Sequence, residues 1–400
     1  MNPDMPTGWT FTAADRALAE ELQPRLPARI FDVHMHLHHT EHVRPSSTYM
    51  EWGPADCNYE VWREFVGGQV GAERLCGALF TPHPSRDGDA DAANAYVAAQ
   101  LENAPGCAAS IIVHSGQRRE DVEALLENPR ECCLKPYYFY SGRTPPSFDC
   151  ALDEFVPEWA WELAQERRLL ILLHLVRDGA LSDPLNQRSI VGWCEKYPNA
   201  QLVLAHAARG FHAPNTVKGI SALRGLTNIW FDSSGVCEAE PLNAILDEFG
   251  PRRLMWGTDF PISQERGRAV TLGTGFVWPV TDRVPWNDDA FFGEPVMVGL
   301  ESLRALLIAA DNAHLNDEDL QDVFCDNAHR VLGLKPETED IVQPLYREAK
   351  SIIPGGTQLL SKRPEWIAPD QWPAYFREAR GYEVWDLDGK HYIDVGTSGV

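Results

Sequence analysis

Short apolar runs alternate with amphipathic segments along about the first 335 residues of this 400-residue chain. Eight of the runs have the length of a buried β-strand, and turn-rich or helix-like segments separate them. They fall at residues 30–36, 75–80, 109–114, 132–138, 169–174, 201–206, 228–231 and 253–259. Parallel strands joined by helices produce this alternation. We therefore predict an α/β fold, a (β/α)8 TIM barrel with a short C-terminal extension.

Helix-terminating residues support the same organisation. Thr12 and Asp15 have the spacing of a capping box, which predicts a helix through about Leu22 within a lead-in of residues 1–29. Pro241 and Gly250 flank an apolar segment that precedes the last strand, as expected for a helix start and a helix end. The barrel itself is expected over residues 30–336.

Four histidines and one aspartate stand at the ends of the predicted strands: His34, His36, His174, His206 and Asp259. His34 and His36 are two residues apart in one strand, so their side chains point to the same side of the sheet. Imidazoles and a carboxylate that converge from several strand ends are suitable ligands for a catalytic divalent metal. In a barrel, this end of the strands is the face where active sites lie.

The order of these residues resembles the amidohydrolase superfamily, in particular the amidohydrolase-related branch that includes decarboxylases of the aminocarboxymuconate-semialdehyde type. The resemblance spans residues 31–334. It implies that His34, His36, His174 and Asp259 bind one divalent metal, with His206 as the catalytic partner beside it. Zinc is the expected ion, and manganese and cobalt accept the same ligands.

Four further residues are expected to contact the substrate. Lys135 stands where members with two metals have a carboxylated bridging lysine, but we favour a simple cation that holds a substrate carboxylate. His114 ends a predicted strand, which favours a structural or substrate-contact role. The segment from Arg266 to Trp278 mixes glycines, guanidinium groups and aromatic rings, so it is either a carboxylate-binding lid or a solvated loop.

The motifs are compatible with three functions. The first is a hydrolase that uses metal-activated water on an amide, ester or lactone carbonyl of a small carboxylated substrate, with His206 and Asp259 handling the proton. The second is a metal-dependent non-oxidative decarboxylase. The third is an inert barrel that serves as a scaffold, although no predicted ligand is missing. We rank hydrolysis first.

Composition restricts the partners. A net charge of -23 argues against nucleic acid and anionic membrane surfaces, which require clustered Lys and Arg. The nine cysteines contain no Cys-x-x-Cys pair, as expected for a reducing compartment. The sequence has neither a secretory signal nor an apolar run near the roughly 20 residues that cross a bilayer. We expect a cytoplasmic protein with a small-molecule substrate.

The end of the chain has a different pattern. After a linker at residues 337–344, residues 345–400 resemble the beginning of a class III pyridoxal-phosphate aminotransferase of the glutamate-1-semialdehyde aminomutase type. The matching segments are residues 349–356, 373–381 and 384–394, the last with an Asp388–Gly389 hairpin turn. The resemblance implies an incomplete domain without aminotransferase activity, pyridoxal phosphate only in a full-length fusion, and compatibility with a homodimer.

Overall fold

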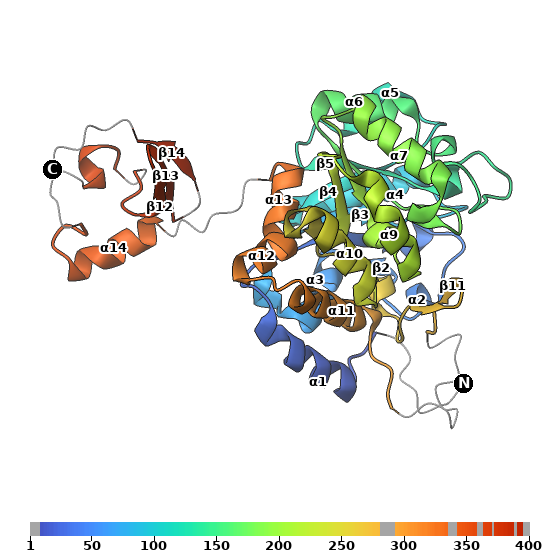
Figure 1. The fold of residues 1–400 in the computed structure, drawn as a ribbon, viewed down its shortest axis with the longest axis horizontal. Helices are drawn as coiled ribbons and strands as arrows, with labels where there is room; N and C mark the ends of the chain where they lie inside the picture. The colour runs from blue at the N-terminus through green and yellow to red at the C-terminus, as the bar shows by residue number, and fades with distance from the viewer. Residues whose placement is uncertain are drawn as a thin grey trace. The chain divides into compact units, whose positions relative to one another are not determined.

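The chain forms two compact units, Met1–Leu334 and Lys335–Val400, in the computed structural model (Figure 1). The structure describes residues 9–280, 293–334, 342–357, 363–369, 372–387 and 390–394. Each unit is described by itself below.

The first unit is the predicted barrel. Its sheet has nine strands in the order β2-β1-β3-β4-β5-β6-β7-β8-β9, all parallel except β2. The strands are β1 Ile30–His39, β2 Asp56–Cys57, β3 Leu75–Pro82, β4 Ala108–Val113, β5 Glu131–Pro136, β6 Leu170–Leu173, β7 Gln201–Leu204, β8 Ile229–Asp232 and β9 Leu254–Met255. A parallel bridge between Met35 and Phe260 and a hydrogen bond from Val33 N to Trp256 O connect the segment after β9 to β1. The fold prediction is confirmed.

Helices surround this sheet (Figure 1). They are α1 Ala13–Leu22, α2 Thr48–Glu51, α3 Tyr59–Val70, α4 Ala90–Gln100, α5 Arg119–Leu125, α6 Glu158–Arg167, α7 Pro184–Lys196, α8 Ala205–Arg209, α9 Ala213–Gly219, α10 Ala239–Phe249, α11 Val298–Asn312, α12 Asp317–Gln321 and α13 Asn327–Leu332. Thr12 and Asp15 form the predicted capping box of α1. Gly250 ends α10 at a φ of 74°, which glycine adopts without strain.

The barrel core has two layers because each strand is buried on both faces. In β6, Leu170 and Leu172 belong to the cluster inside the barrel, whereas Ile171 and Leu173 pack in the cluster between sheet and helices. This explains why the strands are continuous apolar runs rather than alternating ones. None of the helices described between residues 9 and 394 is both long and apolar enough to cross a bilayer.

The two long loops predicted after β1 and β9 contain secondary structure. β1 continues past the histidine pair to His39, and residues 40–57 include α2 and β2. After β9, the strands β10 Val270–Leu272 and β11 Gly275–Val277 form an antiparallel hairpin. The end of that loop, residues 281–292, lies outside the described residues.

The second unit contains α14 Val342–Ile352 and a three-stranded antiparallel sheet of β12 Phe376–Arg380, β13 Glu383–Asp386 and β14 His391–Ile393. The predicted turn at Asp388–Gly389 falls between β13 and β14 but lies outside the described residues, as do residues 337–341 of the linker. Several large apolar side chains in this unit are exposed, including Trp366 at 77% and Tyr382 at 65%. The small sheet therefore buries little apolar surface.

Candidate metal centre

β1 directs two buried histidines into the mouth of the barrel. Phe31 and Val33 pack inside the barrel, but Met35 belongs to the outer layer. The pairing of β1 with β3 shifts register between Asp32 and Met35. Such a shift changes which residues face inward, so His34 and His36 can line the cavity above the interior cluster.

Asp259 completes a three-residue cluster with these histidines. Its Oδ1 lies 3.3 Å from His36 Nε2 and 3.8 Å from His34 Nε2. Its backbone N–H donates to the carbonyl of His34 at 2.7 Å, and its φ of 57° is uncommon for a residue with a side chain. Burial opposes ionisation of this carboxyl group, but the nearby imidazoles outweigh it and keep its pKa below the ordinary value. A carboxylate and two imidazole nitrogens thus face one point.

Asp232 orients His34 and was missed by the sequence analysis. Its Oδ2 lies 3.0 Å from His34 Nδ1, which leaves Nε2 of that ring to face Asp259. A carboxylate on the remote nitrogen of a histidine is the usual outer partner of a metal ligand. Burial alone would raise the pKa of Asp232, but His34, His206 and Ser234 together lower it to about 2. The sequence prediction ended this strand one residue too early, at Phe231.

His206 is fixed by backbone contacts. Its Nδ1 lies 2.9 Å from the carbonyl oxygen of Ser234, so this nitrogen is the donor and Nε2 holds the lone pair. Its own backbone N–H donates to Asp232 Oδ1 at 2.9 Å. The φ of His206 is 58°, so both His206 and Asp259 adopt the left-handed conformation. Such backbone strain is found preferentially at active sites.

His174 lines the same cavity but stands outside the three-residue cluster. Its ring centre lies 5.1 Å from that of His206 and 5.4 Å from that of Tyr137. Its Nδ1 is buried and has no hydrogen-bond partner among the described residues. Burial holds its pKa well below 6.5, so the ring is neutral. A buried neutral imidazole with an unpartnered nitrogen is suited to bind a cation.

Lys135 belongs to the floor of the site. Its side chain is 1% exposed, and Nζ lies 3.4 Å from His34 Nε2. Burial lowers the pKa of this amine to about 8, although Asp232 and Asp259 oppose the shift. Nε2 has a single lone pair, so Lys135 and a metal ion are alternative partners for His34.

These residues surround a cavity of about 280 Å³. Its walls are largely aromatic and include Tyr49, Tyr137, Phe139, Phe211 and Trp278. The indole N–H of Trp278 donates to Glu265 Oε2 at 3.0 Å, which fixes the ring. His83, which the sequence analysis did not single out, also lines the cavity and lies 2.8 Å from the Tyr49 hydroxyl.

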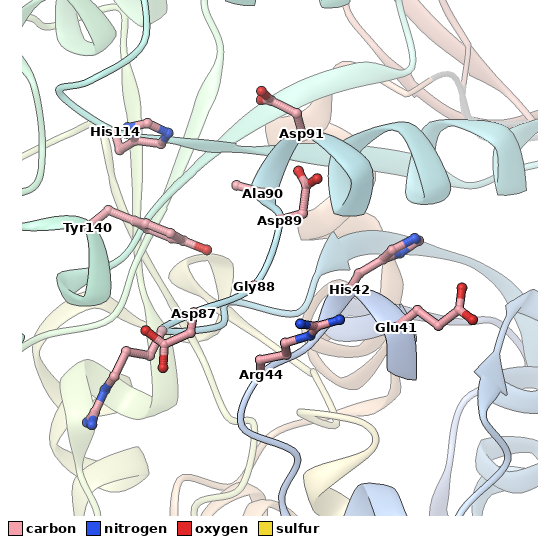
Figure 2. Close-up of a pocket in the computed structure, with 11 residues that line it drawn as sticks. Glu41, His42, Arg44, Asp87, Gly88, Asp89, Ala90, Asp91, His114 and Tyr140 are labelled. Carbon is pink, nitrogen blue, oxygen red and sulfur yellow. The ribbon is translucent and has the colours of Figure 1, made fainter.

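The structure places two predicted substrate-binding residues elsewhere. His114 lines a separate pocket of about 700 Å³, where its ring stacks on Tyr140 near Asp89 and Asp91 at the start of α4 (Figure 2). Its position at a strand end suggested the barrel mouth, but β4 ends at Val113 and the residue belongs to the following turn.

Arg266 is also absent from the cavity lining. Its guanidinium is buried and donates to Asp15 Oδ2 at 2.6 Å and to the carbonyl oxygen of Thr10 at 2.5 Å. It therefore attaches the lead-in segment to the barrel, and the expected contact with a substrate carboxylate is not supported. The sequence could not reveal this because the two charges are 251 positions apart.

Comparison with known proteins supports an amidohydrolase-type barrel. The amidohydrolase family model matches residues 147–334. An L-fucono-1,5-lactonase from Burkholderia ambifaria is 25% identical over 173 residues, which cover 40% of this chain and 56% of the lactonase. An amidohydrolase from Burkholderia multivorans, crystallised with bound zinc, shares the fold with a TM-score of 0.51 at 16% identity, over 77% of this chain and 100% of that one.

The end of the chain has a separate match. A 3-aminobutyryl-CoA aminotransferase from Cloacimonas acidaminovorans is 40% identical over 50 residues, which cover 12% of this chain and 12% of that protein. The chain thus spans little more than half of the lactonase and a small part of the aminotransferase.

Proposed function

We propose that the barrel is a metal-dependent hydrolase that cleaves a lactone or related ester bond of a small substrate. The observation on which this rests is the convergence of His34 Nε2, His36 Nε2 and Asp259 Oδ1 within 3.8 Å on the wall of a buried cavity. The match to a lactonase over 173 residues supports a lactone as the first substrate class to test. Amides and other esters share the same carbonyl chemistry.

The donor set fits one divalent ion. His34, His36 and Asp259 offer three atoms at mutual distances suited to a common ion, and the unpartnered imidazole of His174 is the fourth candidate ligand. Zinc accepts nitrogen and oxygen ligands in this number, as do manganese and cobalt. When bound, such an ion supplies Lewis-acid polarisation of a carbonyl and a water molecule of lowered pKa.

His206 is the residue placed to hold a proton during the reaction. Its Nδ1–H is engaged by Ser234, so the free Nε2 is the basic atom. Nδ1 also lies 4.0 Å from Asp259 Oδ2, and the carboxylate therefore favours a positive charge on the ring. A base oriented in this way can accept a proton from the attacking water and return it to the leaving oxygen.

The cavity selects a small, partly apolar substrate. At about 280 Å³ it is at the lower end of the size of ligand pockets. Aromatic side chains such as Phe211 and Trp278 can cover one face of a sugar-like or aromatic ring. We propose that Lys135, once a cation occupies His34, is free to pair with a substrate carboxylate or ring oxygen.

The direct test is hydrolysis of a panel of aldonolactones by the zinc-reconstituted chain, followed by acid release. We expect turnover, and we expect His206→Asn to lower kcat by at least about 100-fold. Asparagine accepts the left-handed backbone, so the variant should fold. His314→Asn is the matched control because His314 is exposed and also has a positive φ, 54°.

Carboxylated aromatic compounds form the second arm of this test, with carbon dioxide release as the readout. Release of carbon dioxide without lactone hydrolysis would replace the proposal by decarboxylation. No turnover of either class in a metal-loaded, folded chain would favour a scaffolding role.

For the second unit we propose an origin in a class III aminotransferase. The 50-residue match supports this relationship. The stretch covers 12% of that relative, so the proposal concerns ancestry of the segment and assigns no pyridoxal-phosphate chemistry to these 400 residues.

A further inference from the structure

We propose a second metal site, built from Cys76, Cys325 and His329, that binds a thiophilic divalent cation of the zinc class. It is distinct from the candidate metal centre. Cys76 is the second residue of β3, whereas His36 pairs with Thr81 near the other end of that strand. The cysteine group therefore lies at the amino-terminal end of the barrel strands.

The three side chains present their ligand atoms to one another. The two Sγ atoms of Cys76 and Cys325 lie 3.5 Å apart, and Cys325 Sγ lies 3.8 Å from His329 Nδ1. All three ligand atoms lie within 4.8 Å of one another. Cys325 and His329 are buried, and Cys76 is half-buried.

These distances match those between ligands of a tetrahedral zinc ion. Zinc–sulfur bonds of about 2.3 Å and zinc–nitrogen bonds of about 2.0–2.1 Å place two sulfurs about 3.8 Å apart and a sulfur and a nitrogen about 3.6 Å apart. The observed 3.5 and 3.8 Å lie within a few tenths of an ångström of these values. Two thiolates and one imidazole form a soft ligand set, which selects zinc over magnesium or calcium.

The backbone around Cys325 is a second, independent observation. Residues Asp322–Asp326 form a π-helical turn between α12 and α13. Such turns are rare and occur frequently at functional sites. The turn allows Cys325 to belong to the cluster inside the barrel while His329, one helical turn later, packs on Phe31 at 5.2 Å between ring centres.

A bound cation would join two distant parts of the chain. Cys76 and Cys325 are 249 positions apart, and the ion would attach the closing helix α13 to the start of the sheet. A link that closes so long a loop stabilises the folded state, because the ligand set is not assembled in the unfolded chain. The expected role is structural, so loss of the ion should lower stability and leave turnover largely intact.

The test is metal content of the full chain with three variants. Cys76→Ser should lose one equivalent of zinc that Asp259→Ala retains, and Asp259→Ala should lose the equivalent that Cys76→Ser retains. Cys132→Ser is the matched control, since Cys132 is also a half-buried free cysteine but lies outside the cluster. After cobalt loading, sulfur-to-cobalt charge-transfer absorption should disappear in Cys76→Ser and persist in Cys132→Ser.

Removal of zinc with a chelator should lower the Tm of Asp259→Ala, in which only the cysteine site remains. Equal zinc content in Cys76→Ser and Asp259→Ala, or cobalt spectra without sulfur bands in the wild type, would overturn the proposal. A thiol count two lower than in the reduced chain, restored by a reductant and absent in Cys76→Ser, would also overturn it in favour of a disulfide. Failure of lactone hydrolysis alone would leave this site unaffected.

Discussion

At the scale of single residues, the candidate metal centre depends on side chains that fix its histidines. Asp232 and Ser234 both contact His34 Nδ1, at 3.0 and 3.1 Å. The same aspartate accepts a hydrogen bond from the backbone of His206. One buried carboxylate therefore orients a proposed ligand and the proposed base together.

Asp232→Asn should weaken zinc binding by about 10- to 100-fold, because the neutral amide no longer stabilises the ligating form of His34. Competition with a chromophoric chelator would measure the affinity. Asp247→Asn is the control, since Asp247 is exposed on α10. An unchanged zinc affinity in Asp232→Asn would show that His34 is not a ligand.

At the scale of elements, the strands were largely predictable and the side-chain environment was less so. Strands buried on both faces are apolar throughout, which made the runs ending near His174 and His206 visible in the sequence. The shifted register in β1 was not predictable, because it depends on pairing with β3. The alternation rule alone therefore placed His34 and His36 together correctly but gave no account of Val33 facing inward beside them.

The attachment of α1 shows a second limit of sequence patterns. Asp15 was predicted as a capping residue, and it does cap α1. It is also fully buried and accepts hydrogen bonds from Arg266 at 2.6 Å and from the backbone of Met297 at 3.0 Å. Long-range partners of this kind leave no periodic trace in the sequence.

Asp15→Ala should destabilise the barrel by about 3–5 kcal/mol, because it removes a buried carboxylate from a buried guanidinium. Chemical denaturation would measure the change. A double variant that also carries Arg266→Met should recover part of the loss, since no charge then remains at the site. If Asp15→Ala costs less than about 1 kcal/mol, the buried ion pair does not attach α1 as described.

At the scale of the whole molecule, the chain combines a barrel with a small second unit. The barrel's core clusters lie within residues 9–334. The second unit has a three-stranded sheet and exposed aromatic side chains such as Trp366. The barrel therefore does not need the second unit for its own core.

A chain that ends at Leu334 should keep its metal content, and its Tm should change by less than about 2 °C. Scanning calorimetry beside the 400-residue chain would check this. A large drop in Tm would mean that the second unit contributes to the stability of the barrel.

The central claim is that His36 and Asp259 bind a catalytic metal together. Elemental analysis of the purified wild type, His36→Ala and Asp259→Ala tests it most directly, with circular dichroism as the check on folding. We predict that each folded variant holds one equivalent of metal less than the wild type, so any ion at the cysteine site cancels in the difference. Equal metal content in all three proteins, after reconstitution with zinc or manganese, would contradict the account.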